Sequence, residues 1–417
     1  MSVTSSAGDT PADTGHGWKP PVWLIITCGC TIALLAFGPR SAMGFFQEPI
    51  LQDRGWGSTT FGLAIAIQNL AWGLGQPVFG AMADRYGAYR SLALGGLIYA
   101  LGLYIMGVAE TPLWLHIGAG VLVGLGVAAG SFGIILSVFA RNVSPENRSL
   151  VFGMGTAAGS AGMFLFSPLS VGLIDAVGWS HALVWMSVMM LAIPVLAIPL
   201  FGSGKGVAMA QEQIDQTIGE ALREAMTHRS YLLLISGFFV CGFQVAFITA
   251  HFPKYLADIG IDASIAVWAL ALIGLFNIFG SLASGVLGQK YSKPWLLALL
   301  YIGRSVVVTA FLILPQTPTS VIIFSIVMGL LWLSTVAPTN ALVAIMFGTR
   351  HLGMLGGIVF FSHQIGSFLG VFYGGYLRDQ TGSYEVVWWL GVALGIFAAI
   401  VHWPIKEQAV ERGVAAA

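Results

Sequence analysis

Long apolar stretches separated by short polar connections form the pattern of the whole chain. Most stretches reach roughly 20 residues, the length that an α-helix needs to cross about 30 Å of hydrocarbon. Lipid admits only helices or closed barrels as spanning structures, and these runs lack the alternation of barrel strands, so we expect helices. The pattern predicts twelve spans, at residues 22–46, 58–82, 91–109, 114–139, 149–172, 180–201, 231–252, 263–287, 294–314, 320–346, 353–377 and 384–404.

The polar segments divide the predicted helices into two halves. Residues 1–21 are polar and lack the basic-then-apolar order of a signal peptide, so we expect a cytoplasmic tail. The spans predict six-helix halves at 22–201 and 231–404, joined by a partly helical cytoplasmic linker at 202–230. Residues 405–417 form a second cytoplasmic tail.

Lys and Arg are distributed unevenly between the predicted connections. With a cytoplasmic N-terminus, thirteen of them fall on the cytoplasmic side, and only Arg54, Lys254 and Arg378 fall on the other. Because cytoplasmic connections carry the excess of basic residues in membrane proteins, both termini are predicted to be cytoplasmic. We expect a multi-pass integral protein of a bacterial cytoplasmic (inner) membrane.

Composition excludes several classes of protein. Hydrophobic residues make up 57% of the 417 positions and charged residues only 9%, against about 25% charged in a typical soluble domain. The formal net charge of zero provides no basic surface for nucleic acid. The three cysteines lie inside apolar runs, so we predict neither a metal site nor a cofactor. The sequence has no nucleotide-binding loop and no catalytic motif, which disfavours an ATP-driven pump and an enzyme.

Three segments of the first half match segments of the second at an offset of 204 or 205 positions. A unit with an even number of spans keeps its orientation when it is duplicated, so the match predicts a parallel repeat about an axis normal to the membrane. The pairs are Gly80–Gly87 with Gly285–Ser292, Asp53–Gly55 with Asp258–Gly260, and Asp175–Gly178 with Asp379–Gly382.

The segment from Gly80 to Arg90 resembles the loop signature after the second helix of the major facilitator superfamily, and its partial copy lies where that fold expects it. The resemblance implies an all-α membrane protein with 12 transmembrane helices in two six-helix repeats, which transports by alternating access. The carboxylate of Asp84 in this loop can accept hydrogen bonds from amides at a helix end, so we expect the loop to act as a conformational switch. Its residues are Gly80, Asp84, Arg85, Gly87 and Arg90.

A narrower resemblance begins in the first span. The segment 36–46, with a basic residue before a small one and a later Phe-Phe, is similar to the first-helix segment of the monocarboxylate transporter family. Gly55-Trp56 and Gly178-Trp179 fit the same pattern. The resemblance implies transport of small carboxylates.

Arg40, within that segment, is the first candidate for substrate binding. A charge at mid-span costs about 2.5–3.5 kcal/mol even on the insertion scale, so its position needs a reason. A guanidinium can bind a carboxylate through two parallel hydrogen bonds, whereas the alternative is an arginine that reaches the outer interface or is neutralised by a nearby carbonyl or helix end. For Arg304, in the ninth span, the structural alternative is at least as strong.

Histidines are the candidates for proton coupling, because no Asp or Glu lies near the middle of a span. His363, followed by Gln364 in the eleventh span, comes first, and His251 near the outer end of the seventh span comes second. A hydrogen-bonded packing histidine is the alternative for His363.

Neutral polar side chains complete the predicted substrate site. In the eighth span, members of the monocarboxylate transporter family often have an Asp and, four residues later, an Arg, but this chain has Asn277 and Ser281, which share one helix face. The roles of that Asp and Arg are therefore not carried over. Polar residues also join helices in membranes, which is the alternative for each candidate. The other candidates for the substrate site are Gln244, Asn340 and Gln364, with Gln68, Asn69, Gln76 and Thr339.

These features predict a secondary transporter that moves small organic anions, monocarboxylates first, across the cytoplasmic membrane, with protons as a candidate co-substrate. An exporter or exchanger of another small metabolite or drug-like compound is an alternative, as is a transport-dead sensor on the same fold. The expected partners are the anion and the lipid bilayer, without nucleic acid or an obligatory protein partner.

The topology gives a first testable prediction. A reporter that is active only outside the cytoplasm, fused at Lys205 in the linker, should give no signal, because basic residues hold this connection inside. A strong signal from that fusion would reverse the predicted orientation.

Overall fold

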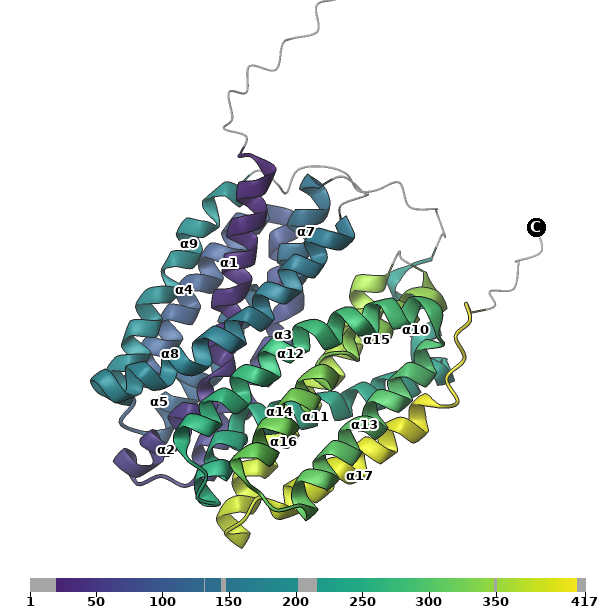
Figure 1. Ribbon diagram of the computed structural model, residues 1–417. Coiled ribbons are helices and arrows are strands. Elements are labelled where there is room, and N and C mark those ends of the chain that lie inside the picture. Colours follow the sequence, from purple (N-terminus) through teal and green to yellow (C-terminus); the bar gives the residue numbers. More distant parts are fainter. Residues whose placement is uncertain (1–19, 131, 144–147, 202–215, 349–350, 411–417) are drawn as a thin grey trace, which may run out of the picture.

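The computed structural model describes residues 20–130, 132–143, 148–201, 216–348 and 351–410. Within these ranges every regular element is a helix, and the helices form two bundles that follow each other in sequence (Figure 1). The first bundle contains α1 (Val22–Ser41), α2 (Met43–Arg54), α3 (Ser58–Tyr86), α4 (Ala88–Gly107), α5 (Pro112–Leu115), η1 (His116–Leu122), α6 (Val123–Ala129), α7 (Phe132–Asn142), α8 (Arg148–Met190), α9 (Ala192–Leu196) and η3 (Ile198–Leu200).

The second bundle follows a short amphipathic helix, α10 (Ile218–Thr227). Thr217 and Glu220 form a capping box at the start of α10, and the hydrogen bonds from Thr217 hold the pKa of the Glu220 carboxyl below its usual range. The bundle itself contains α11 (Arg229–Asp258), α12 (Ala263–Lys290), α13 (Lys293–Ile313), α14 (Pro318–Leu331), α15 (Val336–Phe347), α16 (Leu352–Thr381) and α17 (Glu385–His402). The part of the predicted linker at residues 202–215, with Lys205, lies outside the described residues.

The two bundles converge at one end of the molecule and diverge toward the other (Figure 1). We call the convergent end the α2 end, because it contains α2, the start of α3 and the last turns of α11 and α16. The opposite end contains α10 and is called the α10 end. The predicted topology makes the α10 end cytoplasmic.

Helices occupy all twelve predicted spans. Within the described ranges, ten helical stretches are long and apolar enough to cross a membrane. One of them, Met154–Leu200, would measure about 70 Å if straight, but α8 bends at Gly178, where φ is 79°, so the stretch supplies two spans. α3 is not among the ten, since polar residues such as Gln68 and Asn69 interrupt its apolar sequence, yet it runs through the protein as one 29-residue helix.

Two predicted spans are not the single regular helices that their hydropathy suggested. The span predicted at 320–346 breaks between α14 and α15, at residues 332–335. The span predicted at 114–139 changes from α5 through the π-helical turns of η1 to α6 and α7. Residues 332–335 are apolar or small, and the π-helical segment is apolar apart from His116, so hydropathy gave no sign of either irregular region.

The sequence repeat is also a structural repeat. Shifting α3 by 205 positions gives 263–291, which is the range of α12 within one residue. The turn glycines Gly55 and Gly260 have φ of 66° and 77°, and Gly178 and Gly382 have φ of 79° and 76°. Because L residues rarely adopt these angles, the matched glycines build the same turns in both bundles. The predicted fold class is therefore confirmed.

Glycines let α11 and α16 pack closely in the second bundle. A Cβ added to Gly366 or Gly370 would meet the backbone carbonyl of Phe239 or Phe243, and a Cβ on Gly242 would overlap the carbonyl of His363. Small residues at a spacing of four allow this backbone approach in membrane helices. The packing fixes where His363 and its neighbours on α16 lie.

Candidate functional site

The surface where the two bundles meet has two seams. α3 packs against α16 along one of them, and α8 packs against α12 along the other. At the first seam, a Cβ added to Gly73 of α3 would come within 2.9 Å of Gln364 on α16, so this glycine lets the two helices approach. Arg40, Gln364 and His363, predicted separately from the sequence, come together at this first seam.

Arg40 occupies the last turn of α1, directly after Pro39. One terminal nitrogen donates to Asn69 Oδ1 on α3 at 2.7 Å, and the Cζ atom lies 4.6 Å from the centre of the Trp72 ring. Nε is buried and has no hydrogen-bond partner in the part of the chain that the structure describes. The guanidinium is therefore held in place but keeps a free donor.

Asn69 connects Arg40 to the second bundle. Its own Nδ2 donates to the carbonyl of Ile65 one turn earlier, which fixes the side chain with Oδ1 toward Arg40. Its backbone carbonyl accepts from Gln364 Nε2 at 2.8 Å, across the seam. Gln364 Oε1 in turn lies 2.9 Å from Nδ1 of His363. A continuous path of polar contacts thus joins Arg40 to His363.

This path determines the tautomer of His363. The carbonyl of Asn69 can only accept, so it orients the amino group of Gln364 toward itself and leaves Oε1 facing the imidazole. An amide oxygen also only accepts, so Nδ1 of His363 carries the hydrogen and Nε2 is the basic nitrogen. The ring is stacked on Phe360, with centroids 5.7 Å apart.

A small cavity adjoins Arg40 between the bundles. Arg40, Gln68 and Asn69 line it from the first bundle, while Ala246, Thr249 and Ala250 of α11 close it from the second. It has room for about one water molecule. Since its walls belong to both bundles, its size depends on their separation.

Asn277 and Ser281 belong to the other seam. Asn277 Nδ2 donates to Ser160 Oγ of α8 at 3.0 Å, and Asn277 Oδ1 accepts from Ser281 Oγ and from the backbone N–H of Leu333. Asn277 therefore joins the bundles and also supports the break between α14 and α15.

Arg304 has a structural environment. It is 1% exposed and donates to the carbonyls of Leu331 and Trp332, which the break leaves without helical partners. It also reaches Cys241 Sγ and Gln244 Oε1, both at 3.4 Å. These contacts match the structural alternative for this arginine.

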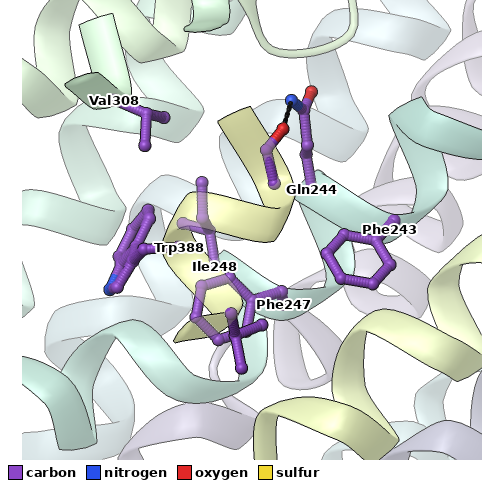
Figure 2. Close-up of a pocket in the computed structure, with 8 residues that line it drawn as sticks. Phe243, Gln244, Phe247, Ile248, Val308 and Trp388 are labelled. Atoms are coloured by element: carbon purple, nitrogen blue, oxygen red, sulfur yellow. Dashed lines mark hydrogen bonds between the residues drawn. The ribbon is translucent and has the colours of Figure 1, made fainter. Parts of the chain in front are cut away.

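Gln244 lies inside the second bundle rather than at the Arg40 cavity. Its Nε2 donates to the carbonyl of Gly391 on α17 at 2.8 Å, beside a mostly apolar pocket lined by Phe247, Val308 and Trp388 (Figure 2). Both ends of the amide thus bind partners of its own bundle. Asn340 is exposed on α15, where Nδ2 bonds back to the carbonyl of Val336.

Ionic and polar contacts close the α2 end across the bundles. Lys254 of α11 pairs with Glu48 of α2 at 2.6 Å. Asp379, near the end of α16, accepts from the backbone N–H groups of Ser58 and Thr59 at 3.0 and 2.7 Å. One bundle thus caps the first helix turn of the other, where an anion is stabilised by the helix dipole. A Cβ on Gly57 would lie 2.8 Å from the Asp379 carboxylate, so glycine makes room for it.

His251 belongs to this closed end as well. Nε2 lies 2.9 Å from the carbonyl of Val371, and Nδ1 lies 3.2 Å from Gln47 Oε1 of the first bundle and 3.3 Å from the hydroxyl of Tyr384. The side chain is completely buried. His251 is therefore separate from the Arg40–His363 path and lies where the bundles would part.

The predicted switch residues lie at the turn between α3 and α4. Gly87 has φ of 91° and ends α3, while Arg85 and Arg90 are exposed. A Cβ on Gly80 would meet open space. The side chain of Asp84 lies outside the described part of the structure, so its predicted role stays a prediction.

Two groups of functional interest were missed from the sequence. Trp72 follows Gln68 by four residues and therefore lies on the same face of the helix. This spacing was the signal in the sequence that could have identified Trp72. Asp379 belongs to one of the matched repeat segments. Its partners, however, are the backbone N–H groups of Ser58 and Thr59, and no pattern of side chains in the sequence marks a backbone partner. Only the folded structure brings them together.

Comparison with known proteins adds a family context. The sequence model of the family described as Major Facilitator Superfamily matches residues 28–371 and, in a second match, 234–416. The chain is 25% identical to Monocarboxylate transporter 13 of Bos taurus over 390 residues, covering 90% of this chain and 85% of the relative. It is 24% identical to the uncharacterized MFS-type transporter YcxA of Bacillus subtilis (strain 168), covering 88% of this chain and 90% of the relative.

Solved transporter structures share the fold at low sequence identity. A D-xylose–proton symporter superposes with a TM-score of 0.72 at 14% identity, over 93% of this chain and 100% of the other. The nucleoside transporter NupG superposes with a TM-score of 0.74 at 12% identity, over 91% and 99%. These relatives and structural neighbours are transporters and not enzymes.

The cap across the first seam gives a prediction. Asp379→Asn should favour conformations that are open at the α2 end, by up to about thirtyfold, because a neutral amide caps α3 more weakly than a carboxylate. The measure is the rate at which an impermeant maleimide labels Thr249→Cys in whole cells, with the native cysteines replaced by alanine.

Asp262→Asn is the matched control. Asp262 caps α12 within its own bundle, accepting from Ser264 N at 2.8 Å, so labelling should not change. Equal labelling rates in folded Asp379→Asn and parent protein would contradict the role of the cap.

Proposed function

Because the chain belongs to the major facilitator superfamily, we propose that it is a secondary transporter of small organic anions, with monocarboxylates as the first substrate class. The similarity to monocarboxylate transporters over 90% of the chain supports this class. The observation that carries the proposal is Arg40, a cation with a free donor at a cavity between the bundles.

The geometry supports binding of a carboxylate at Arg40. Asn69 and Trp72 hold the guanidinium from one side, which lowers the entropy that binding would cost. Nε points to no protein partner among the described residues, so a carboxylate oxygen can accept from it. A charge-assisted bond in a site shielded from water is stronger than one in solvent.

Alternating access would use the two bundles as moving units. We propose that the halves predicted from the sequence, residues 22–201 and 231–404, rotate about the site and expose it to either side in turn. The polar contacts at the α2 end close that side in the present conformation. A substrate held by Arg40 on one half and facing Ala246, Thr249 and Ala250 on the other would contact both halves.

Substitution of Arg40 tests the substrate class. Arg40→Gln should weaken monocarboxylate binding by roughly thirtyfold or more, because a charge-assisted contact is lost. Arg40→Lys should weaken binding less, since the charge remains although the planar fork does not. Uptake and binding of radiolabelled monocarboxylates of two to four carbons, with purified protein in proteoliposomes, are the measurements.

Arg304→Gln is the control for a charge inside the membrane. It should lower thermal stability more than affinity, because the carbonyls of Leu331 and Trp332 lose their donor. If folded Arg40→Gln protein binds the carboxylates as the parent does, the proposed site is wrong.

We propose that any proton coupling runs through His363. Nε2 is its basic nitrogen, and the ring is linked to the arginine through Gln364 and Asn69. A proton on this imidazole would add positive charge to the path that holds the anion, so protonation and anion binding would favour each other.

His363→Gln should keep a polar side chain but abolish accumulation driven by an inward proton gradient. Exchange of substrate across the membrane without a gradient should survive. His251→Gln is the comparison, because His251 lies outside the path and at the α2 end. Accumulation by His363→Gln that equals the parent's would exclude His363 as the coupling residue.

A further inference from the structure

Two residues that line the cavity, Arg40 and Gln68, each carry a buried polar atom without a partner in the described structure, and the two atoms are of opposite character. Arg40 Nε is a donor, and Gln68 Oε1 is an acceptor. Gln68 is 1% exposed, and its Nε2 donates to the carbonyl of Ala119 at 2.8 Å. Because that carbonyl can only accept, the amide cannot turn over, and Gln68 Oε1 remains an acceptor.

An unpartnered buried donor or acceptor costs roughly 1–3 kcal/mol, so a ligand that partners both atoms would gain free energy in this cavity. A ligand that satisfies both must accept from Arg40 and donate to Gln68. A carboxylate with a hydroxyl group on the neighbouring carbon does this with a single small molecule.

A neutral donor suits the cavity better than a charged one. An ammonium group would lie beside the guanidinium of Arg40, and the described lining contains neither Asp nor Glu to compensate it. The small side chains of Ala246 and Ala250, which face this space from α11, admit a short ligand when the bundles separate slightly.

We propose that Gln68 is the specificity-determining residue of this site and that it favours 2-hydroxy acids over 2-oxo acids and unsubstituted acids. The inference rests on the proposed transport of monocarboxylates and deepens it. Arg40 binds the carboxylate that all three classes share, whereas Gln68 Oε1 accepts a hydrogen that only the hydroxy acids offer. A 2-oxo group would instead place a second acceptor against Gln68, with repulsion.

Three acids of three carbons test this difference. Propanoate, 2-oxopropanoate and 2-hydroxypropanoate have the same charge at neutral pH and differ only at the second carbon. The parent protein, purified and reconstituted, should bind 2-hydroxypropanoate about three- to tenfold more tightly than the other two, as expected for one hydrogen bond. This series needs no variant, so equal affinities for the three acids would overturn the proposal even if a substitution impairs folding.

Gln68→Met removes the acceptor at nearly constant side-chain length, and the preference should fall to within about twofold. Gln76→Met is the matched control: Gln76 was a candidate for the substrate site from the sequence, and its Oε1 is also buried and unpartnered on α3 in the described structure, but the structure does not place Gln76 in the lining of the cavity. It should retain the parent's preference.

The outcomes separate this inference from the proposed function. If the parent binds all three acids with equal affinity and Arg40→Gln weakens all three, the carboxylate site stands and the role of Gln68 is wrong. A preference that persists in folded Gln68→Met also overturns that role. If the parent binds none of the acids, the proposed substrate class fails and this inference fails with it.

Discussion

Hydrocarbon offers no hydrogen-bond partners, so each polar group inside the membrane must find its partner within the protein. The two arginines within spans meet this constraint differently. Arg304 donates to carbonyls that the break after α14 leaves open, and so it stabilises an irregular backbone. Arg40 is held by Asn69 and Trp72 but keeps one donor unused among the described contacts. The same residue type thus serves structure in one place and is available for binding in the other.

The seams between the bundles also follow from this constraint. Gln364 meets the backbone carbonyl of Asn69, and Asn277 meets the hydroxyl of Ser160, so each seam is joined by an amide side chain. Neutral amides can exchange partners when the bundles move, without leaving a charge uncompensated. Arg40 stays with its own bundle, and its partner Asn69 moves with it.

Much of the fold was predictable because the length of the apolar stretches is a strong signal of membrane spans, and because the repeated glycines mark equivalent turns. Arg40 and His363 stood out since ionisable residues are rare in spans. The rotation of each helix was not predictable: Gln244 and Gln364 look alike in sequence, yet one faces its own bundle and the other crosses the seam. The break at residues 332–335 was hidden because its residues are apolar or small.

The capping of α3 and α12 differs, although the two helices are repeats. α3 takes its cap from Asp379 of the other bundle, whereas α12 supplies Asp262 itself. Separation at the α2 end would therefore strip two amides of their acceptor along one seam, while the start of α12 keeps its cap. Resistance to opening is therefore one-sided, because the helix cap that crosses between the bundles lies along the α3–α16 seam. We expect the bundles to part more easily along the α8–α12 seam, where separation costs no helix cap.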